Sequence, residues 1–324
     1  MVDVLILGGT GWLGSRVAER WLDRGARVTC LARGHRPAPD GAHLVAADRT
    51  APGAYDAVAD REWDEVVDVS SDAASVASAV AALAAHTRHW TYVSTISVYA
   101  DVDGAGDDES APVRGPGADG ESDYAQEKAA AEALVRTAIG HRGAVVRPGL
   151  IAGPGDPTDR FGYWVSRFAL AGEDPVLVPD TTDKGVAVID VDDLADFIVA
   201  LGDARWTGVV NAVGDPHTLD EVLTQAREVA GHTGDVVTAS DQWLAEQSVA
   251  HWAGPRSLPL SLPPQHRGVW SRSNTAYKIL GGRLRPLRAT LERTLDAERK
   301  AGLDRDRVAG MTREEEISLL SAIE

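Results

Sequence analysis

The chain has 324 residues, of which 44% are hydrophobic and 25% charged, as is usual for a folded protein with one large domain and a smaller one. The net charge of −17 argues against nucleic acid as a partner, and no apolar stretch approaches the ~20 residues that span a membrane. The single cysteine, Cys30, excludes an internal disulfide and a cysteine metal cage, and the N-terminal residues lack a secretory signal, so we expect a cytoplasmic protein.

The first residues of the chain predict a dinucleotide site. A short apolar run over residues 2–7 leads into a glycine-rich turn, and an amphipathic helical pattern follows over residues 15–22. In this context the glycines let the backbone turn tightly and approach a pyrophosphate at the positive end of the helix dipole. An ordinary strand-to-helix turn is the weaker alternative. The turn residues expected to contact the cofactor are Gly8, Thr10, Gly11, Trp12, Leu13 and Gly14.

Strand and helix patterns then alternate through the first half of the chain. This alternation predicts an α/β fold, a Rossmann-type doubly wound parallel sheet with helices on both faces. The expected strands are residues 27–32, 43–47, 65–69, 90–94 and 144–147, and the expected helices are residues 55–60, 73–85 and 123–139.

The second half is less regular. We expect a strand at 186–189, a helix at 191–201 and a strand at 209–213, followed by mixed helical patterns. The predicted organisation is an NAD(P)-binding domain over residues 1–155, to which residues 186–215 return. A smaller, partly helical substrate-binding lobe is expected from residues 156–185 and 216–324, at the carboxyl ends of the strands.

The end of the second strand bears on the choice of cofactor. Sites that prefer NAD place an acidic residue about 20 residues beyond the glycines, whereas this chain has Arg33 and Arg36 there and no acid before Asp40. Arginine suits a 2′-phosphate, so we expect NADP(H) to be preferred, with NAD(H) still usable. The alternative is that both arginines are solvated loop residues.

Two further segments carry candidate catalytic groups. Tyr124 and Lys128 are four residues apart on a predicted helix and therefore share one face, where an ammonium would lower the pKa of a neighbouring phenol. Ser94 and Thr95 follow the fifth strand, at the sheet edge where ligands bind in this fold. Hydroxyls at such a place can also serve only to cap a turn.

Together these segments resemble those of the short-chain dehydrogenase/reductase superfamily, in its extended or atypical branch and the NAD-dependent epimerase/dehydratase group. The resemblance covers about residues 1–215. The matching parts are Gly8 to Gly14, Ser94-Thr95 with Val98-Tyr99, Tyr124 with Lys128, Arg147-Pro148-Gly149 with Gly153-Pro154, and Ile189 to Leu194.

The resemblance implies a role for each matching residue. Tyr124 would be the general acid and base, Lys128 would hold the nicotinamide ribose, and Thr95 would be the catalytic hydroxyl, with Ser94 as its substitute. Near the cofactor it implies Asp48 beside the adenine, and Val69, Ser70 and Pro148 along its length. Val-Ser-Ser stands at 69–71 where many relatives carry a pair of alanines.

Aromatic residues in the second half are candidates for the substrate pocket, although core packing is an equal alternative for each. They are Tyr163, Trp164, Trp252 and Trp270. Arg256, Arg267, Arg272 and Arg283 could hold an anionic substrate, but the surrounding tryptophans, leucines and prolines favour an apolar pocket roof. No metal site is expected, because His86 and His89 lack partners in a ligand pattern.

The sequence favours an NADP(H)-dependent oxidoreductase that reduces a carbonyl or oxidises a secondary alcohol, using Thr95, Tyr124 and Lys128. The first alternative is a nucleotide-sugar epimerase or dehydratase with tightly bound NAD. The second is a dinucleotide-binding regulator without activity, which would need no proton donor such as Tyr124. The expected partner is a small-molecule substrate, and a homodimer is left open.

Overall fold

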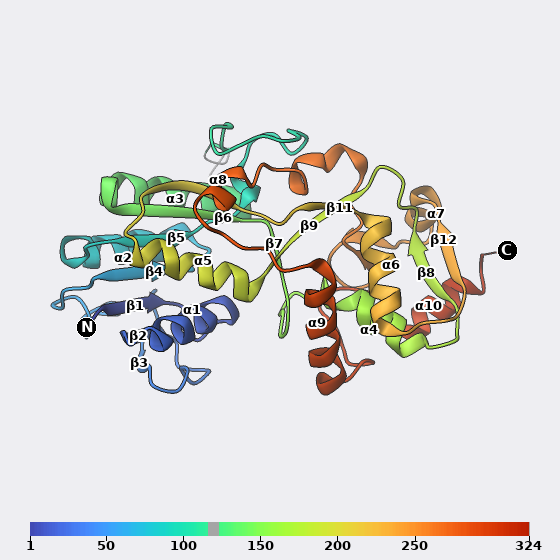
Figure 1. The fold of residues 1–324 in the computed structure, drawn as a ribbon, viewed down its shortest axis with the longest axis horizontal. Helices are drawn as coiled ribbons and strands as arrows, with labels where there is room; N and C mark the ends of the chain where they lie inside the picture. Colours follow the sequence, from blue (N-terminus) through green and yellow to red (C-terminus); the bar gives the residue numbers. More distant parts are fainter. Residues whose placement is uncertain (116–122, 324) are drawn as a thin grey trace.

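The computed structural model describes residues 1–115 and 123–323. Its centre is a seven-stranded sheet in the order β10-β6-β5-β4-β1-β2-β3, in which every neighbouring pair is parallel (Figure 1). The strands are β1 (Asp3–Leu7), β2 (Arg27–Ala32), β3 (His43–Ala46), β4 (Glu65–Asp68), β5 (Trp90–Val93), β6 (Gly143–Pro148) and β10 (Gly208–Ala212). The predicted fold class is confirmed, and each predicted strand of this sheet is found within one residue at either end.

Helices cover both faces of the sheet, which explains why its strands are continuous apolar runs. One face packs against α1 (Trp12–Asp23) and α5 (Val191–Asp203), and the other against α2 (Ala73–Leu83) and α3 (Tyr124–Ile139). Alternate residues of β1 serve the two faces, since Ile6 packs on the first and Leu5 on the second.

The boundaries of α3 follow from its sequence. Asp123 accepts a hydrogen bond from the Gln126 backbone at 2.9 Å, and the Gln126 side chain accepts one from the Asp123 backbone. At the other end Gly140 adopts a φ of 58°, a conformation that an L side chain rarely adopts. These caps place Tyr124 in the first turn of the helix.

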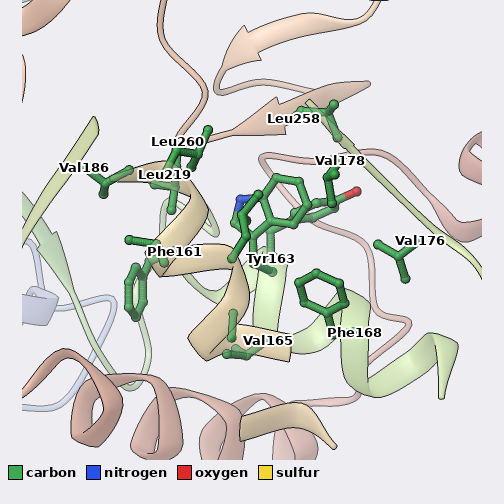
Figure 2. Packing of buried hydrophobic residues seen from close by; sticks show 14 of the residues in the cluster. Phe161, Tyr163, Val165, Phe168, Val176, Val178, Val186, Leu219, Leu258 and Leu260 are labelled. Atoms are coloured by element: carbon green, nitrogen blue, oxygen red, sulfur yellow. The ribbon is translucent and has the colours of Figure 1, made fainter. Parts of the chain in front are cut away.

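A second hydrophobic core lies beyond the carboxyl ends of the strands, on the right in Figure 1. Figure 2 shows its aromatic centre, where Tyr163 and Phe168 pack against Leu258 and Leu260. Its helices are α4 (Gly162–Ala171), α6 (Leu219–Ala230), α7 (Asp241–Glu246), α9 (Leu287–Ala301) and α10 (Arg313–Leu320), while α8 (Thr275–Ile279) packs on the central sheet through Tyr277.

Seven further strands of the described residues lie outside the central sheet. They form the sheets β11-β9-β7, β12-β8 and β13-β14. Their bounds are β7 (Leu150–Ala152), β8 (Val176–Pro179), β9 (Gly185–Asp190), β11 (Pro216–Thr218), β12 (Val236–Ala239), β13 (Ala250–Trp252) and β14 (Ser257–Pro259). The 3-10 turns are η1 (Ala84–His86), η2 (Ile96–Val98), η4 (Gly140–Arg142) and η5 (Pro264–Val269).

The structure departs from the sequence-based prediction in two elements. The prediction of a helix at 55–60 is wrong. This segment forms turns, and the Tyr55 hydroxyl accepts a hydrogen bond from Arg49 at 2.8 Å. The strand expected at 186–189 exists as β9, but it pairs with β7 and β11, so the chain returns to the central sheet only with α5 and β10. The predicted domain boundaries stay a prediction. Within the described residues no helix has the length and apolar character needed to cross a membrane.

The second core should respond to truncation of a large side chain. Leu291 on α9 is fully buried, so Leu291→Ala should lower the free energy of unfolding by about 2–5 kcal/mol through lost contacts and an internal cavity. Urea unfolding followed by tryptophan fluorescence measures the change. The matched control is Ile279→Ala, whose side chain is 78% exposed and should alter stability by less than about 0.5 kcal/mol. Equal effects of the two variants would contradict this packing.

Candidate active site

Two adjoining cavities lie along the carboxyl ends of the central strands, with volumes of about 690 and 630 Å³. We call them cavity A and cavity B; Gly11, Val69 and Ser71 line both, so they form one continuous groove. This is the edge at which ligands bind in open α/β sheets. Of the predicted residues, cavity A gathers Gly8, Thr10, Gly11, Arg33, Arg36, Asp48, Val69 and Ser70, and cavity B gathers Gly11, Trp12, Leu13, Gly14, Val69, Ser94, Thr95, Tyr124, Lys128, Pro148 and Trp252.

The glycine turn is shaped for a pyrophosphate. The Gly11 backbone donates to the Gly8 carbonyl at 2.9 Å, and a Cβ at Gly14 would come within 2.3 Å of that same oxygen. Helix α1 begins at Trp12 without a side-chain cap and with no acidic residue in its first turn. Its N-terminal amides are therefore directed at the groove with a positive dipole end, which fits a dinucleotide diphosphate.

The far end of cavity A carries the groups expected near the adenosine. Arg33 and Arg36 are exposed at its rim, and within residues 1–115 and 123–323 neither lies within 4.0 Å of a carboxylate. Asp48 accepts hydrogen bonds from the Thr50 backbone and hydroxyl at 3.0 and 2.7 Å, and these bonds, with the charges of Arg33 and His35, hold its pKa below the usual range. This end of the groove thus offers free positive charge beside one carboxylate.

Arg49 is a member of this site that sequence reasoning missed. It forms a bidentate ion pair with the fully buried Asp68 at 3.1 Å and donates to the Ser75 carbonyl at 2.7 Å. Asp68 in turn accepts from the Ser70 backbone at 2.9 Å. The available signal was the position of Arg49 directly after Asp48, at the end of a strand. The pair fixes the segment after β4 that separates the two cavities.

Lys128 occupies the wall between cofactor and catalytic groups. The residue is 2% exposed, and its ammonium donates to the carbonyl oxygens of Ser70 and Val93, each at 2.7 Å. Burial lowers the pKa of Lys128 to about 8, although the charges of Asp68 and Asp72 oppose the shift. The ammonium therefore joins α3 to the ends of β4 and β5, within reach of the groove.

Tyr124 and Thr95 meet in cavity B. The cavity walls raise the pKa of the Tyr124 phenol, while a hydrogen bond with Thr95 and the positive charge of Arg160 lower it. The expectation that Lys128 depresses this pKa is wrong for this structure, because its ammonium is engaged by two carbonyl oxygens and the net shift is upward. Thr95 also accepts a hydrogen bond from the Ser97 backbone at 3.2 Å, which fixes its position. The pair can hold a substrate oxygen and exchange a proton with it.

Ser94 lines cavity B, but its hydroxyl serves the structure. It donates to Glu132 at 3.1 Å, and Glu132 is paired with Arg147 through two hydrogen bonds, all three groups being buried. The suggestion that Ser94 could replace Thr95 or contact substrate stays a prediction, since its donor is used by Glu132 while the residue lines the cavity.

Only one of the four aromatic candidates reaches the cavities. Trp252 lines cavity B, whereas Trp164 is 0% exposed and Tyr163 is 1% exposed in the second core. Figure 2 shows Tyr163 within this core. Trp164 donates to the Pro259 carbonyl at 2.8 Å, which secures β14. Trp270 lies against Gly185, where a Cβ would come within 2.4 Å of its ring. The prediction of Tyr163, Trp164 and Trp270 as substrate contacts is therefore wrong, because packing holds them elsewhere.

The expected apolar roof forms only in part, because Trp252 lines cavity B but Leu258, Leu260 and Trp270 do not. Leu258 and Leu260 belong to the second core. Three of the four arginines that were candidates for binding an anionic substrate instead form ion pairs outside the two cavities: Arg256 with Glu315, Arg267 with Asp183 and Arg272 with Asp107. The arginine that does line cavity B is Arg160, which sequence reasoning missed. It follows the Gly153-Pro154 segment quoted above, and that adjacency was the available signal.

With this geometry established, comparison with known proteins identifies the family. The model of the NAD-dependent epimerase/dehydratase family matches residues 4–213. The chain belongs to this family. The resemblance seen in the sequence is thereby confirmed, and as a member of the NAD-dependent epimerase/dehydratase family the chain is an NAD(P)-dependent enzyme of the short-chain dehydrogenase/reductase type. No curated protein matches the sequence significantly.

Solved structures of epimerases share the fold over nearly their whole length. A putative epimerase from Burkholderia cenocepacia J2315 is 24% identical with a TM-score of 0.72, and 92% of this chain and 98% of that one are covered. UDP-glucose 4-epimerase from Thermus thermophilus, solved with NAD, is 20% identical with a TM-score of 0.66 and coverage of 93% and 100%. UDP-glucuronic acid 4-epimerase from Bacillus cereus, also with NAD, is 14% identical with a TM-score of 0.70 and coverage of 93% and 99%.

Protonation of Lys128 should make the affinity for the dinucleotide depend on pH. The charged ammonium can donate to ribose hydroxyls and attract the diphosphate, whereas the neutral amine does so weakly. Because its pKa is lowered to about 8, affinity for the dinucleotide should fall as pH rises through about 8, approaching tenfold per pH unit. Fluorescence titration from pH 6 to pH 10, roughly the span of the lysine transition, measures this.

Lys128→Gln is the control for that titration. It should bind the dinucleotide weakly at every pH and show little pH dependence, because the titrating group is gone. A parent protein whose affinity is flat across the range, or a variant that keeps the full dependence, would contradict the role given to Lys128.

Proposed function

We propose that the protein is an epimerase or dehydratase that acts on a sugar nucleotide and retains NAD between turnovers. The observation that carries the proposal is the charge of cavity B. Among the described residues that line it, the charged side chains are Lys128 and Arg160, both cations, although the protein as a whole carries −17. A cavity without acidic side chains beside a tyrosine proton donor suits an anionic substrate such as a nucleoside diphosphate sugar.

The chain's own residues supply the acid–base chemistry. Tyr124, as phenolate, removes the proton of a substrate hydroxyl while Thr95 hydrogen-bonds the same oxygen, and the proton returns by the reverse path when the carbonyl is reduced. The bound nicotinamide supplies the two-electron oxidation and reduction of the adjacent carbon. Lys128 would hold the nicotinamide ribose, and the positive charge of Arg160 stabilises the Tyr124 phenolate.

Membership of an enzyme family and a complete Thr95, Tyr124 and Lys128 set disfavour the alternative of a regulator without activity. The second core would form the substrate-binding lobe, since it supplies Trp252 to cavity B and lies over the carboxyl ends of the strands. The lobe expected over residues 156–185 and 216–324 stays a prediction.

A second candidate function is an NADP(H)-dependent carbonyl reductase. It rests on Arg33 and Arg36, which line cavity A without carboxylate partners in the described part of the chain. An enzyme that retains its cofactor gains nothing from a 2′-phosphate, whereas one that consumes reducing equivalents uses the NADPH pool. The two candidates therefore differ in net redox change and in cofactor exchange.

Removal of the tyrosine hydroxyl tests the chemistry. Tyr124→Phe should lower turnover about 10²-fold or more and leave dinucleotide affinity within about twofold of the parent, because the hydroxyl acts on substrate. The assay follows the interconversion of UDP-glucose and UDP-galactose, and separately the dehydration of dTDP-glucose, by chromatography together with the absorbance of reduced nicotinamide. Product formation without net change in that absorbance supports the epimerase or dehydratase.

Tyr163→Phe is the matched control, since its hydroxyl is buried in the second core and lines neither cavity. It should keep the parent's turnover. Full activity in Tyr124→Phe would contradict the mechanism. Stoichiometric oxidation of NADPH with a ketone, and no action on any sugar nucleotide, would favour the second candidate over the first.

The cofactor preference is tested at Arg33. If Arg33 and Arg36 bind a 2′-phosphate, the parent should bind NADPH more tightly than NADH, and Arg33→Ala should remove most of the difference by losing a charge-assisted contact of about 1.5–3 kcal/mol. Fluorescence titration with both nucleotides measures it. The control is Arg24→Ala, because Arg24 is an exposed arginine at the C-terminal end of α1 that pairs with Asp203. Equal affinities in the parent, or tighter NADH binding, would remove this argument for NADP.

A further inference from the structure

Arg160 stands on a loop whose backbone is fixed at several points. The loop runs from β7 to α4, and the Trp12 indole of the glycine turn donates to its Pro154 carbonyl at 2.9 Å. Asp156 accepts from the Thr158 backbone and hydroxyl, both at 2.8 Å. Asp159 is tied to the C-terminal segment, since it accepts from the Val308 backbone at 2.8 Å and pairs with Arg305. The position of Arg160 is thus set from both the cofactor turn and the second core.

The Arg160 side chain extends over the Trp252 ring, with its guanidinium carbon 4.9 Å from the ring centre. Its Nε donates to the Thr158 hydroxyl at 3.2 Å, and no carboxylate of the described residues lies within 4.0 Å of its guanidinium. Stacking restricts the side chain without consuming its terminal N–H groups. Those groups remain to bind a ligand in cavity B.

The platform for this arginine is itself specialised. Trp252 adopts a φ of 67° at the end of β13, a conformation that costs free energy for a residue other than glycine. The parallel pairing of β13 with β14 places Trp252 opposite Pro259, whose carbonyl is held by Trp164. The second core therefore holds the ring in a strained position that supports Arg160.

We propose that Arg160 determines substrate specificity: it binds an oxyanion of the substrate, a phosphate or a carboxylate, and so places the reacting oxygen at Tyr124 and Thr95. The inference rests on the proposed function, because it names how that cavity selects its substrate. The positive charge of Arg160 also lowers the pKa of Tyr124, so recognition and proton transfer involve neighbouring groups of one cavity.

Binding measurements in the presence of saturating NAD test the proposal, since the cofactor then occupies its own phosphate site. Three probes are used in calorimetric titrations: UDP-glucose, inorganic pyrophosphate and succinate, which separate a sugar nucleotide, a phosphate and a carboxylate. Arg160→Gln should lower the affinity for whichever probe the parent binds by about tenfold or more. Arg160→Lys keeps the charge but loses the planar fork, so a smaller loss of about threefold is expected.

Arg136→Gln is the matched control. Like Arg160→Gln, it removes one positive charge, but from a side chain on α3 that is 59% exposed. It should change the affinity for the probe by less than about twofold. A spectroscopic readout is independent of the probe. The ultraviolet absorbance of tyrosinate, assigned with Tyr124→Phe, should show a higher Tyr124 pKa in Arg160→Gln and the parent value in Arg136→Gln.

The outcomes separate the two proposals. Arg160-dependent binding of succinate, with no binding of UDP-glucose, supports the role of Arg160 and contradicts the sugar-nucleotide function. Binding and turnover of UDP-glucose that are unaffected in Arg160→Gln support that function and overturn the role of Arg160. An equal loss of NAD affinity in Arg160→Gln assigns the residue to the cofactor and also overturns it, as does failure of the parent to bind any of the three probes.

Discussion

The site depends on one buried cation. Burying an ammonium costs free energy unless oxygen atoms replace its hydration shell. For Lys128 these are the carbonyl oxygens of Ser70, which follows β4, and of Val93, which ends β5. The carboxylate of Asp68 lies behind this contact and is balanced in turn by Arg49. A single chain of charges therefore joins the adenosine end of the groove to α3. Loss of Arg49 would leave the buried Asp68 carboxylate without its ion-pair partner.

The two cores meet where the loop of Arg160 contacts the glycine turn. The Trp12 indole links these segments directly, and Asp190 at the start of α5 accepts from Thr290 of α9 at 3.0 Å. Trp12 is the first residue of α1, and Asp190 precedes α5, so each contact begins at a helix that packs on the central sheet. Cavity B is consequently built from both, with its proton donor on one side and its cation and aromatic platform on the other.

The central sheet could be predicted because its strands carry their own signal: each is an apolar run bounded by turn residues, and both faces are buried. The glycine turn and the spacing of Tyr124 and Lys128 are equally local. The substrate side could not be predicted in this way. Whether an aromatic residue such as Trp164 or Trp252 lines a cavity depends on which distant segments cover it, and Arg160 is distinguished from the paired Arg256 only by the acids around each. Residues 55–60 look helical but form turns, in which Tyr55 binds Arg49.

The cationic lining of cavity B has a consequence for the kinetics of encounter. A protein of net charge −17 repels an anionic ligand at long range, whereas Lys128 and Arg160 attract it only once it has entered the groove. At physiological ionic strength the Debye length is about 8 Å, so counterions shorten the reach of the repulsion more than they weaken contacts inside the cavity. Added salt should therefore speed the association of an anionic ligand at low ionic strength and slow it little at higher values. A high affinity would then come mainly from a slow dissociation rate, which is set by the contacts at the bottom of the groove.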